Sequence, residues 1–213
     1  MESEVEAVRH EYDALATVYD RRWRHYIKVT LRAIVERVPF QGQERVLDIA
    51  CGTGELERLL LSRWPNLRIV GADVSLGMLK QAAIKHQGKK VEWVQADAAH
   101  LPFDDQSFDY AICANSFHYF QSPIQSLHEV HRVLRPHGVF VLDDWCDDYL
   151  SCKLCSLWLR LTEPAFHRTY STRALRSLLE QSGFEVIHAD CFRVGIIWGM
   201  MHFISRRRAR DSS

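Results

Sequence analysis

Five short apolar segments alternate with helical segments in the first two thirds of the chain, and this alternation constrains the fold more than any other feature. The segments read RVLDIA, LRIVGAD, KVEWVQAD, FDYAICAN and GVFVLDDW, and all are rich in β-branched or aromatic residues. Several are apolar almost throughout, which is typical of strands covered on both faces. Helices are predicted between them, at about 55–64, 75–87 and 123–135. Such alternation predicts a doubly wound, mostly parallel α/β sheet.

Further elements flank this alternating region. Residues 5–38 have apolar and aromatic side chains at helical spacing and predict one long helix or two helices, ended by Pro39 and Gly42. A helical region is expected from Trp145 to about Leu161, and another at about 172–182. The segments FEVIHADCF and GIIWGMMHFISR then predict two strands joined as an antiparallel hairpin at the sheet edge.

The composition limits the classes of partner. With 213 residues the chain has the length of one domain, and its formal net charge is zero. Nucleic-acid binders usually carry a basic excess, so we expect no nucleic-acid partner. The longest apolar run, GIIWGMMHFI, has about half the length of a membrane-spanning helix, and the acidic N-terminus does not resemble a signal peptide. We therefore expect a cytoplasmic protein without an integral membrane segment; its oligomeric state is not predicted.

A glycine turn follows the first predicted strand, in the stretch VLDIACGTGE. In open α/β sheets, ligands bind at the carboxyl ends of the strands, so this turn should contact a ligand. Three acids argue against a dinucleotide. Glu57 occupies the place of the third fingerprint glycine, and Glu55 would compete with an anion for the helix N-terminus. Asp48 would repel a pyrophosphate by on the order of a few kcal/mol at close range.

The same acids are compatible with a cationic ligand that has no phosphate. S-adenosylmethionine carries an ammonium and a sulfonium, and Asp48 can hold the amino group directly or through water. Asp73, at the end of the second strand, can accept both ribose hydroxyls. Asp97, at the end of the third strand, can accept from the adenine amine, with Val74, Met78 and Ala98 lining the ring. Each acid alone can equally cap a helix or anchor a turn; three at successive strand ends favour a ligand.

These motifs together resemble a known family. The runs VLDIACGTG, GADVSLGML, ADAAHLPF, SFDYAICANSFHYF and LHEVHRVLRPHGVFVL, within about residues 44–146, are similar to class I S-adenosylmethionine-dependent methyltransferases, and in particular to the UbiE-like group. The resemblance implies a single domain with a seven-stranded sheet of order 3-2-1-4-5-7-6 and an antiparallel last strand. It also implies that residues 1–40 form a helical lid over a methyltransferase domain at 41–213.

The resemblance also assigns residues to the cofactor. It places Asp48, Gly52 and Gly54 at the methionine end, Asp73 at the ribose, and Asp97 with Ala98 at the adenine. Further cofactor contacts are expected from the turn, the lid and the fourth strand, at Ala50, Tyr19 and Asn115. Ala50 departs from the family, which often has glycine there, and we expect its methyl to be tolerated at a negative φ.

The methyl acceptor is less constrained than the cofactor. Methyl transfer needs alignment of the acceptor and exclusion of water, and a base only if the acceptor keeps a proton. His118 and Tyr19 are the candidate catalytic residues, although a loop histidine more often serves packing. The acceptor is expected to be a small molecule, with a prenylated quinone precursor as one option. Whether O, N, C or S receives the methyl group is not predicted.

Three alternatives stay open. A nicotinamide-dependent oxidoreductase is disfavoured by Asp48 and the absent third glycine, and a non-catalytic binding module is disfavoured by the intact acids. The six cysteines should be reduced, and the single C-x-x-C pair indicates no zinc site, so no metal is predicted. Thiols at Cys146, Cys152 and Cys155 can bind a soft acceptor such as arsenite, but small buried side chains are the default interpretation.

Overall fold

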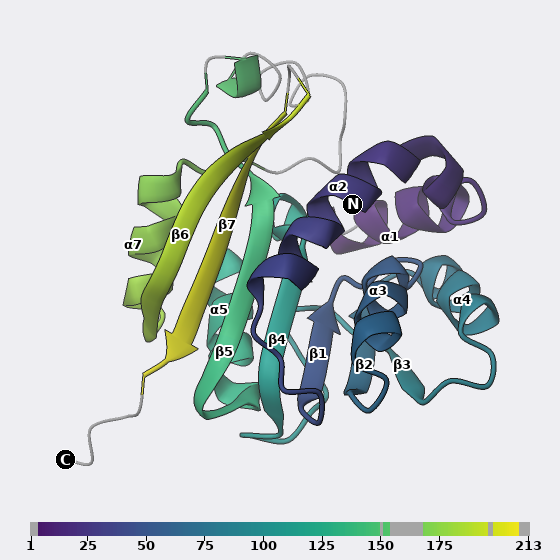
Figure 1. Ribbon diagram of the computed structural model, residues 1–213. Helices are drawn as coiled ribbons and strands as arrows, with labels where there is room; N and C mark the ends of the chain where they lie inside the picture. Colours follow the sequence, from purple (N-terminus) through teal and green to yellow (C-terminus); the bar gives the residue numbers. More distant parts are fainter. Residues whose placement is uncertain (1–3, 150, 154–167, 196–197, 209–213) are drawn as a thin grey trace.

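The computed structural model describes residues 4–149, 151–153, 168–195 and 198–208. Its seven strands form one sheet in the order β3-β2-β1-β4-β5-β7-β6 (Figure 1). The strands are β1 Arg45–Ile49, β2 Arg68–Asp73, β3 Val91–Gln95, β4 Phe108–Ala114, β5 Leu134–Trp145, β6 Phe184–Val194 and β7 Trp198–Arg207. Strands β1 to β5 are parallel, whereas β7 runs antiparallel to both of its neighbours. The predicted fold class and strand order are confirmed.

Helices cover both faces of the sheet. They are α1 Glu4–Leu15, α2 Tyr19–Arg37, α3 Glu55–Arg63, α4 Leu76–Lys85, α5 Pro123–Val133 and α7 Thr172–Gln181, with a short 3₁₀ turn at Phe117–Tyr119. Helices α2 and α3 bury apolar side chains against one face, while α5 and α7 pack on the other (Figure 1). Each helix has an apolar stripe for this purpose, which is the pattern a doubly wound fold requires.

The carboxyl-terminal half agrees with the prediction in topology but not in one strand boundary. The predicted antiparallel hairpin of β6 and β7 lies at the sheet edge, with β7 between β5 and β6 as the predicted strand order requires. Strand β5 begins at Leu134, four residues before the predicted strand GVFVLDDW, because Leu134 pairs with Phe108 across a bulge. Most of the helical region expected between Trp145 and Leu161, together with Cys155, lies outside the described residues.

The amino-terminal region forms two helices rather than one. Helix α2 packs Leu31, Ile34 and Val35 into the core beside β1 and β4. Helix α1 instead lies beside α4 near the carboxyl ends of the strands (Figure 1). Along the described part of the chain, every helix is too short or too polar to cross a membrane.

Candidate active site

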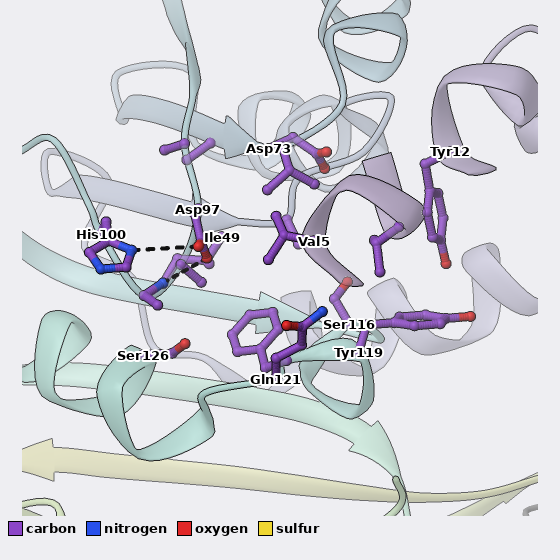
Figure 2. Close-up of a pocket in the computed structure, with 18 of the residues that line it drawn as sticks. Val5, Tyr12, Ile49, Asp73, Asp97, His100, Ser116, Tyr119, Gln121 and Ser126 are labelled. Atoms are coloured by element: carbon purple, nitrogen blue, oxygen red, sulfur yellow. Dashed lines mark hydrogen bonds and ion pairs between the residues drawn. The ribbon is translucent and has the colours of Figure 1, made fainter. Parts of the chain in front are cut away.

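A cavity of about 310 Å³ lies at the carboxyl ends of β1, β2 and β4, beneath α1. This volume lies at the lower end of the range for small-molecule sites. Figure 2 shows its walls: Val5 and Tyr12 come from α1, Asp73 ends β2, Asp97 follows β3, and Tyr119 follows β4. Of the sequence-predicted cofactor residues, eight line it: Tyr19, Ala50, Gly52, Asp73, Val74, Met78, Asp97 and Ala98.

The glycine turn has a left-handed backbone at both of its glycines. Gly52 and Gly54 have φ of 56° and 78°, and Gly52 faces open space where a ligand can approach. Ala50 has φ of 57°, so the negative φ at which its methyl was expected to be tolerated is not observed. A left-handed alanine costs about 1–2 kcal/mol, because its Cβ lies close to the following carbonyl oxygen. The turn therefore stores strain beside the cavity.

Asp73 is fixed by two backbone amides. Gly52 N–H donates to Oδ2 and Ser75 N–H donates to Oδ1, each at 2.8 Å. Burial raises the pKa of Asp73 to about 6, although these backbone hydrogen bonds oppose the shift. Each carboxylate oxygen has a second lone pair, so the side chain can still accept from two ligand hydroxyls.

Asp97 is held in a turn of its own. Its Oδ1 accepts from Ala99 N–H at 3.0 Å, and its Oδ2 lies 3.5 Å from His100 Nδ1 (Figure 2). The carboxylate is more exposed than that of Asp73, with 36% of the side chain accessible. It can therefore accept from a ligand amine at the cavity rim, as predicted, while also anchoring its turn.

Three tyrosines pack against one another at the lid side of the cavity. The Tyr12 ring lies 5.9 Å from Tyr19 and 5.6 Å from Tyr119, the latter edge-on. Burial raises the pKa of Tyr19 to about 12, so its hydroxyl stays protonated and can donate a hydrogen bond. Aromatic faces attract cations, and a sulfonium is a cation. The sequence indicated the aromatic lid residues but missed Val5 and Val8, whose spacing to Tyr12 matches one helix face.

Four predicted residues do not line this cavity: Asp48, Gly54, Asn115 and His118. Asp48 is buried beneath the turn, where its carboxyl group faces that of Glu57. Asn115 instead connects β4 to α2, because its Oδ1 accepts from Tyr26 Oη at 2.7 Å and its amide donates to Thr30 at 3.0 Å. The residues predicted to bind the ribose and the adenine therefore line the cavity, whereas of those predicted for the methionine end only Gly52 does.

His118 forms a buried pair with Asp144. Its Nδ1 donates to Asp144 Oδ1 at 2.5 Å, and its backbone N–H donates to Oδ2 at 2.7 Å. The imidazole stacks on Trp145 with ring centroids 4.1 Å apart, and Trp145 Nε1 donates to Tyr26 Oη at 2.6 Å. This network packs the 3₁₀ turn against β5 and α2. The base role of His118 stays a prediction.

Two residues of the cysteine-rich segment, Cys146 and Asp148, lie close to Cys191 of β6. Sulfur and oxygen atoms of Cys146, Asp148 and Cys191 lie within 4.8 Å of one another. Asp148 Oδ2 already accepts from Thr172 N–H at 3.0 Å, so this carboxylate holds the start of α7. Burial raises the pKa of Cys146 to about 12, which keeps that thiol protonated in the metal-free protein. These contacts account for the cluster without a ligand.

The comparisons with known proteins agree with this geometry. Residues 47–142 match the protein family described as "Methyltransferase domain". Residues 47–142 are thus similar to a methyltransferase domain. The match spans the glycine turn, Asp73 and Asp97, and together with the relatives described next it confirms the resemblance to UbiE-like methyltransferases. The family match also supports the prediction that the cofactor is S-adenosylmethionine.

Curated relatives carry related names. The chain is 30% identical over 142 residues to a ubiquinone/menaquinone biosynthesis C-methyltransferase UbiE of Desulfotalea psychrophila, covering 65% of this chain and 55% of that protein. It is 38% identical over 125 residues to a demethylmenaquinone methyltransferase of Thermus thermophilus, covering 58% and 54%. The chain thus spans about half the length of the curated relatives it matches.

A solved structure supports the fold independently. The S-adenosylmethionine-dependent methyltransferase of Mesorhizobium loti aligns over 85% of this chain and 97% of its own, with a TM-score of 0.70 and 21% identity. At this identity the likeness establishes the shared fold of the methyltransferase domain.

Proposed function

We propose that this chain transfers the methyl group of S-adenosylmethionine to a small molecule. The observation that carries the proposal is the cavity in which a left-handed glycine turn meets two strand-end carboxylates, Asp73 and Asp97. A nucleoside without phosphate suits this rim, because anionic side chains repel phosphate but accept from hydroxyl and amine groups. S-adenosylmethionine supplies an electrophilic methyl group that needs no further activation.

Each end of the cavity has a distinct role in this proposal. Asp73 accepts the ribose hydroxyls, and Asp97 accepts the adenine amine above Val74 and Met78. The backbone around Gly52 approaches the methionine part, with Asp48 acting on the amino group from below through the turn or a water molecule. The residues present therefore fit the cofactor that the family implies.

The lid completes the site by excluding water. Val5, Val8 and Tyr12 of α1 close one wall of the cavity, and Tyr19 begins α2 beside them. Exclusion of water protects an alkylating centre from hydrolysis and holds the acceptor in line with it. We assign residues 1–40 this lid role, with α2 also forming part of the domain core through Leu31 and Ile34.

The apolar lining favours an apolar, aromatic acceptor. Val5, Val8, Leu101 and Phe120 contribute aliphatic and aromatic surface next to Tyr119. The relatives named above act, by their names, on ubiquinone or menaquinone precursors and on demethylmenaquinone. We therefore propose a quinone precursor as the acceptor class. Methylation of an aromatic carbon also requires loss of a proton, for which His118 stays a candidate base.

Two other functions are distinguishable by ligand. An NAD-dependent oxidoreductase would need to place a pyrophosphate beside the Gly52 turn, above the buried Asp48. A non-catalytic module would bind the cofactor without transferring its methyl group.

The test combines binding with turnover. Calorimetry should detect S-adenosylmethionine and its demethylated product but not NAD. Labelled donor should then transfer its methyl group to a reduced, ring-demethylated quinone with a short prenyl tail, and not to a polar amine of similar size. Transfer to the amine alone would contradict the acceptor class, and binding without transfer to any metabolite in a cell extract would favour the non-catalytic module.

A further inference from the structure

Glu57 is a fully buried acid in the first turns of α3, where a dinucleotide-binding fold has its third glycine. That glycine normally allows close packing of helix on strand. In this chain the glycine lies on the strand instead. A Cβ added to Gly71 of β2 would lie 2.8 Å from Glu57 Oε1 and 2.5 Å from the Trp93 ring. Gly71 therefore makes the space that the Glu57 carboxyl group occupies.

The neighbouring strands define what surrounds this carboxyl group. Gly71 pairs with Asp48 of β1 on one side and with Trp93 of β3 on the other, so all three lie in one row across the sheet. The Trp93 indole also contacts the turn, because a Cβ on Gly54 would lie 2.8 Å from its ring. Trp93 thus seals the acid from solvent.

Glu57 and Asp48 face each other as a hydrogen-bonded pair. Within the described residues, neither Glu57 oxygen nor Asp48 Oδ1 has any other side-chain donor, and the backbone N–H of Glu57 interacts with its carboxyl group only weakly. Two ionised carboxylates cannot hydrogen-bond to each other, because both only accept. A buried pair of this kind is satisfied when one proton lies between the two groups.

The surrounding charges favour keeping that proton. Asp73 faces the pair from the end of β2, and the buried thiol of Cys51 faces it from the turn. Lys85 of α4 acts on Glu57 in the opposite direction, but its Nζ donates to Asp20 and Glu55 at 2.6 Å each. Burial raises the pKa of Glu57 to about 7 and that of Asp48 well above its usual range, and their mutual repulsion adds to the shift of Asp48.

We propose that Glu57 is a positioning residue that shares one proton with Asp48, and that binding of the cationic cofactor beside the glycine turn releases this proton. The second half of this proposal rests on the proposed function. A positive ligand group near Asp48 favours the ionised form of both acids, so the proton that satisfied the empty pair is displaced. Affinity for the cofactor then rises with pH, by up to about tenfold per pH unit for one proton released.

The shared proton is tested first without any ligand. If Glu57 is protonated in the folded chain and ionised when unfolded, the folded state binds the extra proton between about pH 4.5 and 7. The free energy of unfolding should then fall across this interval in the wild-type chain relative to Glu57→Gln. The matched control is Glu92→Gln, which removes an exposed acid next to Trp93. If the free energy of unfolding changed with pH in the same way in wild type and Glu57→Gln, the proposal of a shared proton would be wrong.

Proton release is tested by calorimetry of S-adenosylmethionine at pH 7 in buffers of different ionisation enthalpy. We expect proton release on cofactor binding by wild type and by Glu92→Gln, and close to none by Glu57→Gln. Equal release from wild type and Glu57→Gln would contradict the inference while leaving the proposed function intact. If wild type shows the ligand-free pH dependence but binds no S-adenosylmethionine, the proposed function fails and with it the release step.

Discussion

The Asp13 carboxylate accepts a hydrogen bond of 2.5 Å from the Ser75 hydroxyl, which connects α1 directly to the start of α4. The same Asp13 oxygen accepts from the Gly77 backbone N–H at 2.7 Å. Ser75 in turn caps α4 by accepting from Met78 N–H at 3.0 Å. The lid is therefore attached to the helix that presents Met78 to the cavity.

Removing this attachment should weaken cofactor binding more than it weakens folding. Asp13→Ala deletes both hydrogen bonds from a largely exposed side chain, so we expect about 1 kcal/mol or a fivefold loss of affinity for S-adenosylmethionine. The free energy of unfolding should change by less than that. Calorimetry and amide hydrogen exchange test this together: α1 amides should exchange faster while α5 amides do not. Unchanged affinity with faster α1 exchange would contradict the lid role.

Ala50 provides a test of backbone strain at the cavity. Ala50→Gly should stabilise the folded chain by about 1 kcal/mol, because glycine adopts the observed φ of 57° without the Cβ penalty. The gain is partly offset by the greater freedom of glycine in the unfolded chain. Urea denaturation measures it. A loss of stability of 0.5 kcal/mol or more would show that the left-handed conformation is not strained.

The fold, and the strand-end residues that line the cavity, could be predicted from the sequence because both are periodic or local. Strand–helix alternation and the Gly52 turn are read directly along the chain, and Asp73 and Asp97 follow from the rule that ligands bind at strand ends. The glycine turn also indicated Glu57 as unusual, but not its burial. That burial depends on Gly71 and Trp93, which lie on other strands.

Other parts of the site could not be predicted because they depend on pairings between distant residues. Asn115 lies 89 residues from Tyr26, and only the folded chain shows that this pair draws Asn115 away from the cavity. The attachment of Asp13 to Ser75 spans 62 residues. The φ of Ala50 also could not be predicted from the sequence, because the tight turn between β1 and α3 imposes it.

Asp73 should be important for binding. Asp73→Asn keeps an acceptor and similar shape but removes the negative charge, so affinity for S-adenosylmethionine should fall by about 1–3 kcal/mol. Asp73→Ala should in addition destabilise the fold, because Gly52 and Ser75 N–H groups lose their acceptor. Calorimetry and thermal unfolding distinguish these effects. An affinity of Asp73→Asn equal to wild type would contradict the ribose role.

The same residue should give stability a characteristic pH dependence. The pKa of Asp73 is about 6 in the folded chain and near 4 when unfolded, so the folded state binds more protons between these values. Its contribution to stability is therefore present at low pH and lost as pH rises through about 6. Between pH 4 and 7, the free energy of unfolding of Asp73→Asn should rise relative to that of wild type by on the order of 1–3 kcal/mol. Urea midpoints at each pH measure it, and a constant difference would contradict the shift.

The His118–Asp144 pair separates structural from catalytic effects. His118→Ala should destabilise the chain by about 2–4 kcal/mol, because it leaves Asp144 buried without its side-chain partner. If His118 is also the base, a double variant with Asp144→Ala should recover stability but not turnover. Denaturation and single-turnover kinetics of both variants decide this. Full turnover in the double variant would contradict a base role.

The measurement that tests the central claim most directly is the choice of ligand at the cavity. Isothermal titration of the purified chain with S-adenosylmethionine and with NAD, at the same pH and salt, compares a cationic donor with a phosphorylated one. We predict saturable binding of S-adenosylmethionine, weakened in Asp73→Asn, and no measurable binding of NAD. Tighter binding of NAD than of S-adenosylmethionine would contradict a methyltransferase site built on Asp73, Asp97 and the Gly52 turn.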